Sequence, residues 1–185
     1  MIVRLNDITP EGLDISFTLD PEKLNQRVNI DETSAKPGTV TQAINFPTER
    51  ENLAKVSMHL DLIGRDVLIK GRTVAPYQSF CSKCLEPTKN SITSDFYLTL
   101  KQHKGNARED EFDDLDLVFF SGDEINTEEI AEEYLILNLP VVILCSPNCQ
   151  GLCANCGANL NLSPCNCPKS QGTLGELMRL KGLKI

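Results

Sequence analysis

The stretch that decides the fold runs from residue 56 to residue 75 and reads Val-Ser-Met-His-Leu-Asp-Leu-Ile-Gly-Arg-Asp-Val-Leu-Ile-Lys-Gly-Arg-Thr-Val-Ala. From Val56 to Leu62 every second residue is apolar, which is the pattern of a strand with one buried face. Gly64-Arg65-Asp66 interrupts the alternation as a turn, and Val67–Ala75 forms the return strand. The sequence therefore predicts a β-hairpin at the centre of the first hundred residues.

Further strands are predicted on both sides of this hairpin. Residues 13–19 alternate between apolar and polar side chains until Asp20-Pro21 breaks the pattern. A strand is also expected over residues 91–100, and a shorter one over residues 115–120. Residues 25–50 are polar and contain prolines, so they are expected to form a loop or weak strands.

One helix stands out, over residues 128–138. Thr127 is a plausible N-cap, and the acidic residues that follow it suit the first turn of a helix. Spacings of four and three residues place three apolar side chains on one face of this helix. These are Ile130, Tyr134 and Leu137.

These elements predict an α+β fold, in which an antiparallel β-sheet of hairpins is joined by one main helix and a C-terminal cysteine-rich zinc-knuckle segment. The composition changes at Pro140. We therefore expect a β-rich domain over residues 1–139, and a cysteine-rich metal-binding segment with a basic tail over residues 140–185, packed on the first part. Leucines at a spacing of three suggest a short docked helix over residues 173–185.

The chain is acidic, with a formal net charge of −8 over 185 residues. This argues against a nucleic-acid-binding protein with a broad basic face. Residues 1–139 carry 14 Lys and Arg against 25 Asp and Glu, whereas the remaining residues have a small basic excess. No stretch approaches the ~20 apolar residues of a membrane span, and the N-terminus does not resemble a secretory signal. These features favour a cytoplasmic protein.

Eight cysteines in four close pairs give the strongest chemical signal. The pairs are Cys81/Cys84, Cys145/Cys149, Cys153/Cys156 and Cys165/Cys167. Stable disulfides are uncommon in a reducing cytoplasm, whereas zinc takes four tetrahedral ligands that close pairs of thiolates supply two at a time. The pattern predicts that all eight cysteines are ligands of one or two structural zinc ions.

The sequence leaves the grouping of the pairs open. The loop from Cys156 to Cys165 is short, so the last two pairs can close on one zinc, which leaves Cys81/Cys84 and Cys145/Cys149 for a second site that joins the β region to the C-terminal segment. Alternatively, Cys145/Cys149 could share the local site while the Cys165/Cys167 pair joins Cys81/Cys84.

Other chemistries are less well supported. An iron–sulfur cluster uses the same ligands, and a redox-active C-x2-C needs a helix N-terminus that Cys81, between two predicted strands, lacks. Catalytic zinc usually involves His or a carboxylate and an open position. His59 is expected to be a solvent-facing strand residue, and His103 lies at a strand end. Neither histidine has metal-ligand spacing to another candidate ligand. No phosphate-binding, dinucleotide-binding or nucleophile motif is present.

Three motifs occur in an order that resembles a known family. The first is Cys81-Ser-Lys-Cys84-Leu-Glu-Pro, the second is the acidic helix leading into Leu135–Pro140 and Cys145, and the third is Cys149-Gln-Gly-Leu-Cys153-Ala-Asn-Cys156-Gly-Ala-Asn-Leu-Asn161. From about Met58 onwards the chain resembles the YceD family, also called DUF177 or the large ribosomal RNA subunit accumulation proteins.

The resemblance implies a bacterial, non-enzymatic factor for accumulation or processing of 23S ribosomal RNA or for ribosome assembly. Its partners would be large-subunit rRNA or ribosomal and processing proteins, with neither a membrane nor a small-molecule substrate. RNA contact would fall on the basic tail or near Lys83 and Lys89. The basic tail residues are Lys169, Arg179, Lys181 and Lys184. The alternatives are a zinc-stabilised protein-interaction adaptor unrelated to ribosomes and a metal-dependent nuclease.

Overall fold

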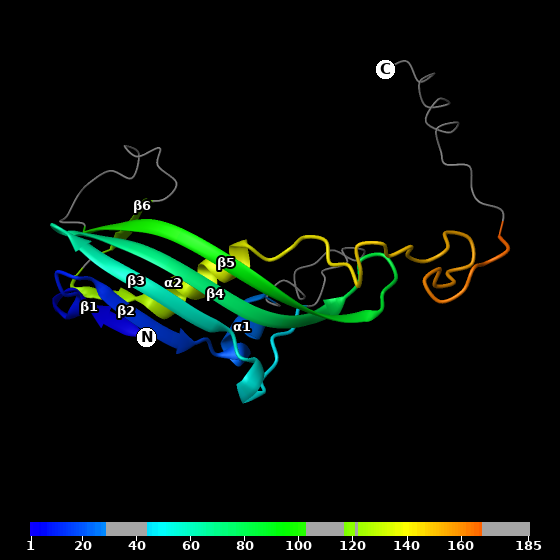
Figure 1. The fold of residues 1–185 in the computed structure, drawn as a ribbon, viewed down its shortest axis with the longest axis horizontal. Helices are drawn as coiled ribbons and strands as arrows, with labels where there is room; N and C mark the ends of the chain where they lie inside the picture. Colours follow the sequence, from blue (N-terminus) through cyan, green and yellow to red (C-terminus); the bar gives the residue numbers. More distant parts are fainter. Residues whose placement is uncertain (29–43, 103–116, 121, 168–185) are drawn as a thin grey trace, which may run out of the picture.

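The computed structural model describes residues 1–28, 44–102, 117–120 and 122–167. Within these ranges the structure is mainly β-sheet with two α-helices. The central sheet has the strand order β2-β3-β4-β5-β6 (Figure 1). Its strands are β2 (Leu13–Thr18), β3 (Lys55–Ile63), β4 (Asp66–Phe80), β5 (Pro87–Gln102) and β6 (Leu117–Phe120). Short 3-10 turns occupy Leu5–Asp7 and Arg50–Asn52.

The predicted hairpin is confirmed and is longer than the pattern indicated. Ile63 pairs with Asp66 across a two-residue turn, and Gly64 adopts a φ of +68° there. A second, larger hairpin follows, because β4 and β5 stay paired from Val67 opposite Leu100 to Phe80 opposite Pro87. The turn that closes this second hairpin contains the first pair of cysteines.

The prediction of a purely antiparallel sheet is wrong at one edge. β6 runs parallel to β5, with Thr99 opposite Leu117. Parallel neighbours need a crossover of a dozen or more residues, and the chain between Gln102 and Leu117 has that length. Alternation within one short strand carries no information about its direction, so the sequence pattern could not reveal this pairing.

The predicted helix is present as α2 (Thr127–Leu137), but its cap and part of its buried face differ from the prediction. The N-cap is Asn126, whose side chain accepts the N–H of Glu129 at 3.3 Å. Thr127 is buried instead, and its hydroxyl donates to the carbonyl of Met1 at 3.0 Å. Ile130 and Tyr134 pack against the core as predicted, but the fully buried apolar residues of the helix are Ala131 and Leu135, and Leu137 is 72% exposed.

A second helix, α1 (Pro21–Val28), forms where a loop was expected. Asp20-Pro21 ends the preceding strand and also starts this helix, because proline suits the first helical position. The Asp20 carboxylate accepts the Glu22 N–H at 2.9 Å, and Leu24 is fully buried. Residues 29–43 of the predicted loop lie outside the described residues, and in its last part Asn45 forms an isolated antiparallel bridge with Gln78.

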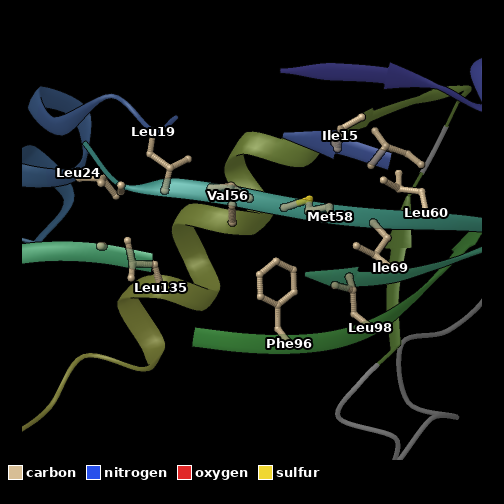
Figure 2. Packing of buried hydrophobic residues seen from close by; sticks show 14 of the residues in the cluster. Ile15, Leu19, Leu24, Val56, Met58, Leu60, Ile69, Phe96, Leu98 and Leu135 are labelled. Carbon is tan, nitrogen blue, oxygen red and sulfur yellow. The ribbon is translucent and has the colours of Figure 1, made fainter. Parts of the chain in front are cut away.

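The core lies between one face of the sheet and the two helices (Figure 2). The side chains of alternate strand residues point into it, and α2 contributes its inward face. Its most deeply buried members include Leu19, Leu24, Leu60, Val67, Ile69, Leu98, Leu100 and Leu135. The opposite face of the sheet is exposed to solvent, as the alternation in β3 and β4 predicts.

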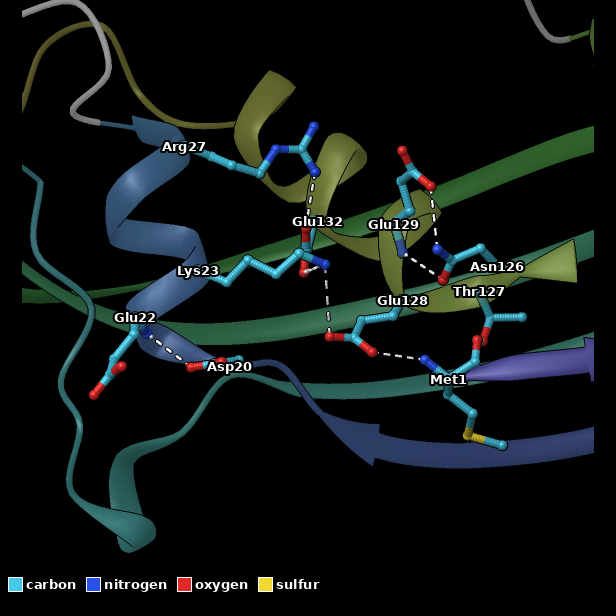
Figure 3. Close-up of polar contacts among 10 residues, drawn as sticks. All are labelled: Met1, Asp20, Glu22, Lys23, Arg27, Asn126, Thr127, Glu128, Glu129 and Glu132. Atoms are coloured by element: carbon cyan, nitrogen blue, oxygen red, sulfur yellow. Dashed lines mark hydrogen bonds and ion pairs between the residues drawn. The ribbon is translucent and has the colours of Figure 1, made fainter.

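Charged contacts fix α1 against α2 (Figure 3). Glu132 of α2 is fully buried, and Lys23 Nζ and Arg27 Nη1 each lie 2.8 Å from one of its oxygens. Glu128, one turn earlier, lies 2.6 Å from the amino group of Met1. A buried carboxylate is costly unless it is paired, so these ion pairs determine where α1 can dock.

The N-terminus is held by a separate two-stranded sheet. Strand β1 (Ile2–Arg4) pairs antiparallel with β7 (Glu124–Asn126), directly before α2. Val3 and Ile125 from these strands are buried in the core. No helix within the described ranges has the length and apolar character needed to span a lipid bilayer.

Gly71 is required by close packing. It faces the core directly opposite Phe96, and a Cβ at this position would lie 2.1 Å from Phe96 Cζ. The Phe96 ring also stacks on Tyr134 of α2, with centroids 4.8 Å apart and an interplanar angle of 15°. The ring therefore fills the space between the β4 backbone and α2.

Replacing Gly71 with alanine should lower the free energy of unfolding by about 1–3 kcal/mol, because the added methyl group overlaps the Phe96 ring. Urea unfolding of the two proteins measures this difference. Gly64→Ala is the control, since nothing lies within 4 Å of a Cβ there and only its positive φ is strained. In a Phe96→Leu background the Gly71→Ala penalty should shrink; an undiminished penalty would show that the ring is not its cause.

Candidate metal centres

The first group of four cysteines joins the tip of the β4–β5 hairpin to the segment after α2. Cys81 and Cys84 lie in the hairpin turn, and Cys145 and Cys149 follow the helix. The Sγ atoms of Cys81 and Cys149 are 3.6 Å apart, as are those of Cys84 and Cys145. All but Cys145 are buried. We call this group the hairpin tetrad.

The second group comes from one short stretch of chain and is more exposed. Cys153, Cys156, Cys165 and Cys167 place their sulfurs within 4.8 Å of one another. Cys156 is exposed and the other three are half-buried. We call this group the loop tetrad.

The hairpin tetrad has the dimensions of a tetrahedral zinc centre, and the sulfurs of the loop tetrad also lie close enough together to share one ion. With Zn–S bonds of about 2.3 Å, the sulfurs of such a centre lie about 3.8 Å apart, close to the 3.6 Å separations in the hairpin tetrad. Four thiolates fill the coordination sphere and leave no position for a reactive water, which is the arrangement of structural zinc. Each tetrad could therefore hold one closed metal site.

The two C-x2-C turns have the same backbone geometry. In the first, the Leu85 N–H donates to the Cys81 carbonyl at 2.9 Å, and the Cys81 N–H donates to the carbonyl of Glu86 at 2.9 Å. In the second, the Gly157 N–H donates to the Cys153 carbonyl at 2.9 Å, and the Cys153 N–H donates to the carbonyl of the residue after Gly157 at 2.8 Å. Each tetrad is thus built on one copy of the same knuckle.

Backbone amides prepare the first sulfur of each knuckle for ionisation. Burial disfavours the Cys81 thiolate, but three backbone N–H groups, chiefly that of Cys84, donate to its sulfur and lower its pKa to about 6. At Cys153, the backbone N–H groups of Cys156 and Asn155 lower the pKa, again to about 6. The two knuckles therefore supply thiolates near neutral pH.

Two other sulfurs, those of Cys84 and Cys167, ionise less readily. The backbone N–H of Glu86 lowers the pKa of Cys84, but burial and the neighbouring sulfurs raise it to about 12. The nearby sulfur of Cys156, together with burial, raises the pKa of Cys167 to about 12. A divalent cation would supply the positive charge that allows all four thiols of a tetrad to lose their protons.

The two knuckles are packed against each other. The Leu152 N–H donates to the carbonyl of Lys83 at 3.0 Å, and Asn159 Nδ2 donates to Glu86 Oε1 at 3.1 Å. Gly151 has a φ of +77°, and a Cβ there would lie 3.0 Å from the Lys83 carbonyl oxygen. Any larger residue at Gly151 would push the knuckles apart.

Asn161 links the loop tetrad to the hairpin tetrad. Its Nδ2 donates to Cys149 Sγ at 3.4 Å, and its Oδ1 accepts the N–H of Gln150 at 2.8 Å. The sequence motif contains Asn159 and Asn161, but spacing alone gave them no role. The only sign of this role in the sequence was that asparagines recur beside the cysteines.

The sulfurs are grouped as in the first of the two arrangements considered from the sequence, and the exchanged arrangement does not match these distances. That the eight cysteines bind metal stays a prediction. Lys83, expected to be available for RNA, donates to the carbonyl of Cys149 at 3.4 Å. The basic residues Lys169, Arg179, Lys181 and Lys184, together with His103, lie outside the described residues.

His59 lies away from both tetrads, on the solvent-exposed face of the sheet. Its Nδ1 is 2.8 Å from Asp14 Oδ1, and its Nε2 is 3.1 Å from Asp61 Oδ1. These contacts, that with Asp14 first, raise the pKa of His59 above the ordinary 6.5. The ring is therefore protonated over a wider pH range than an isolated histidine.

Comparison with known proteins identifies a family model that matches residues 69–184, described as "Large ribosomal RNA subunit accumulation protein YceD". No solved structure gives a significant match.

Several curated proteins are similar in sequence. A chloroplastic "Large ribosomal RNA subunit accumulation protein YCED homolog 1" of Zea mays is 31% identical over 83% of this chain and 57% of its own length. The protein of the same name from Arabidopsis thaliana is 29% identical over 66% of this chain and 45% of its own length. An uncharacterized Mycobacterium tuberculosis protein is 29% identical over 60% of this chain and 54% of its own length. The chain thus spans about half the length of the curated relatives it matches.

The residue that follows the second cysteine differs between the two knuckles, and this difference predicts opposite effects of substitution. Leu85 has a φ of 60°, while its counterpart Gly157 has a φ of +72°. A left-handed conformation costs a non-glycine residue about 1–2 kcal/mol. Leu85→Gly should therefore raise the free energy of unfolding by about 1 kcal/mol, and Gly157→Leu should lower it by a similar amount.

Chemical unfolding of the full chain measures both changes. Leu162→Gly is the matched control, because Leu162 is also an exposed loop leucine, at 78% exposure, but its φ is not positive. If Leu85→Gly lowers the free energy of unfolding as much as Leu162→Gly does, glycine does not relieve backbone strain at Leu85. The interpretation that Leu85 is strained would then be wrong.

Proposed function

Because this chain belongs to the YceD family of large ribosomal RNA subunit accumulation proteins, we propose that it is a non-enzymatic factor that supports 23S rRNA accumulation during assembly of the large ribosomal subunit. We place this role in the cytoplasm. The observation that carries the proposal is the family match over residues 69–184, a range that includes most of β4 and all of β5, α2 and both tetrads. The printed names of the plant relatives point to the same role.

We also propose that each tetrad holds one structural zinc ion. The sulfur separations, the amide donors to Cys81 and Cys153 and the thiolate-only donor sets support this. Within the described segment between Cys145 and Cys167, the one buried residue of the hydrophobic core is Cys149, and Ile143 is buried just before this segment. Metal coordination would replace the missing core there.

The zinc centres affect which molecules can bind nearby. A Zn(Cys)4 centre carries about two negative charges, so two centres would make the knuckle end of an acidic chain more acidic still. Phosphates would be repelled from this end, and basic ribosomal or processing proteins would be attracted to it. The tetrads therefore serve to shape a surface and do not contact RNA directly.

A protein-interaction adaptor is the second candidate, and one observation favours it. Large apolar side chains are exposed around the hairpin tetrad, which is unusual unless a partner covers them. They are Phe80 at 52%, Leu85 at 58%, Val141 at 92% and Val142 at 62% exposure.

The zinc proposal predicts one zinc ion per tetrad in natively purified protein, measured by elemental analysis. Cys84→Ser should remove the hairpin zinc, and Cys153→Ser should remove the loop zinc, each leaving the other in place. A chelator should act first on the loop tetrad, because its sulfurs are more exposed. Hydrogen exchange should then rise in residues 145–167 while the hairpin around Gly64 stays protected.

Ser79→Ala is a suitable control for these serine variants, since it changes a buried side chain two residues before Cys81 without removing a sulfur. Protein that contains iron, or protein whose exchange in residues 145–167 is unaffected by chelation, would contradict the zinc proposal.

The rRNA proposal predicts that tagged full-length protein sediments with precursors of the large subunit on sucrose gradients. A strain that lacks the protein should accumulate less mature 23S rRNA relative to 16S rRNA, measured by quantitative hybridisation. Normal 23S rRNA in that strain, together with absence of the tagged protein from every large-subunit precursor fraction, would refute the proposal. Captured partners that are all non-ribosomal would favour the adaptor.

A further inference from the structure

The sheet face that α2 does not cover presents polar side chains in ordered rows. The register of β2 to β5 aligns the residues across four strands. One row consists of Asp14, His59, Lys70 and Tyr97. The adjacent row consists of Ser16, Ser57, Arg72 and Asp95.

These two rows border a hollow of about 290 Å³. A second hollow, of about 430 Å³, shares Ser16, Ser57 and Arg72 with the first and extends to Lys55 and Val74. Two small serine side chains lie between longer neighbours, so the surface is low there. The hollows therefore form one continuous trough over the open face, which we call the sheet trough.

Tyr97 provides an aromatic platform at one end of the sheet trough. Its side chain is 64% exposed on a strand whose alternate residues form the core. An exposed ring on an open sheet is a surface on which an unpaired base can stack. Lys70 lies directly opposite it on the neighbouring strand.

Positive charge borders the trough in a form that suits phosphates. Arg72 is held by Asp95 through two hydrogen bonds, from Nε to Oδ1 and from Nη2 to Oδ2, so its guanidinium is oriented while its other N–H groups remain available. Among the described residues, Lys55 and Lys70 have no ion-pair partner. His59, directly opposite Lys70, adds a fourth cation when it is protonated.

We propose that the sheet trough binds single-stranded RNA, with one unpaired base stacked on Tyr97 and the adjoining phosphates held by Lys55, Lys70 and Arg72. This inference rests on the proposed function and names the part of the chain that touches RNA. Duplex RNA is disfavoured, because its paired and stacked bases are not available to a flat aromatic surface. A protein partner is disfavoured, because the centre of the trough is charged and polar, whereas interface cores are depleted in charged residues.

The site also explains how an acidic chain can contact RNA. The acidic side chains of α2, such as Glu128 and Glu132, lie on the covered side of the sheet, where they pair with α1 and the N-terminal amine. Three carboxylates beside the trough, those of Asp14, Asp61 and Asp95, are paired with His59 or Arg72. Lys55 and Lys70 thus remain as cations without an ion-pair partner among the described residues, and they can bind phosphate although the net charge of the chain is −8.

Fluorescence anisotropy of the zinc-loaded full chain tests the inference. The probe is a labelled, unstructured single strand of 23S rRNA sequence, compared with the same strand annealed to its complement. The single strand should bind more tightly than the duplex. Tyr97→Ala should weaken binding by about tenfold, the loss expected for one base–aromatic stack, and Tyr97→Phe should keep wild-type affinity because the ring remains.

Matched controls separate this site from general surface effects. Phe80→Ala removes an exposed ring, 52% exposed, from the far end of the same strand pair and should not change affinity. Lys70→Gln should reduce the slope of log affinity against log salt by about 0.7, the value for one phosphate contact to a single strand. Arg65→Gln, in the exposed turn outside the trough, should leave that slope unchanged.

Several results would overturn the inference. They are undetectable single-strand binding, equal binding of strand and duplex, and wild-type affinity of Tyr97→Ala. If the Tyr97→Ala variant no longer captures a protein partner but still binds RNA, the trough is a protein-binding site and the inference is also refuted. A strain that lacks the protein distinguishes the two proposals. If the Tyr97→Ala variant restores 23S rRNA in this strain to the wild-type level, the RNA-binding inference is wrong and the proposed function stands. If the strain has normal 23S rRNA before any variant is supplied, the proposed function itself is wrong.

Discussion

The pairing of β4 with β5 is the interaction on which the other features depend. Its register sets Gly71 opposite Phe96, and the Phe96 ring then provides a contact for Tyr134 of α2. The same register aligns Lys70 with Tyr97 on the other face of the sheet. At its far end, the ladder closes at a turn that presents Cys81 and Cys84. A shift of one residue would exchange the two faces of a strand and disrupt all of these arrangements together.

The C-terminal part of the described chain relies on a different kind of stabilisation. Between Cys145 and Cys167 the chain forms neither a helix nor a long strand, and it is held by knuckle hydrogen bonds and by asparagine side chains. Gly151 lets this segment approach Lys83 closely enough to share backbone hydrogen bonds. The sheet thus supplies a rigid support, and coordination at the sulfurs would make the attached segment rigid as well.

The sequence predicted the parts of the fold that depend on local alternation. The strands around Gly64 and the helix beginning near Thr127 have clear periodicity, so their existence was correctly predicted. Features that depend on spatial neighbours were missed. Asp20-Pro21 was interpreted only as a strand break, and Leu137 was assigned to a buried face that the packing of Ala131 and Leu135 defines differently. The grouping of the cysteines into two tetrads could be assigned only from the structure. All thiols are chemically equivalent, and their spacing favoured one arrangement without excluding the other.

The hairpin tetrad closes a long loop. Cys81 and Cys149 are 68 positions apart, and β5, β6, β7 and α2 all lie between them. A metal ion that joins these ends would restrict the unfolded chain as a cross-link does, an effect of about 4 kcal/mol for a loop of this size in the chain-entropy description. The loop tetrad encloses only a short segment and gains much less in this way. During synthesis, moreover, the cross-link cannot form until Cys149 has left the ribosome, so the sheet must be held by its own core until then.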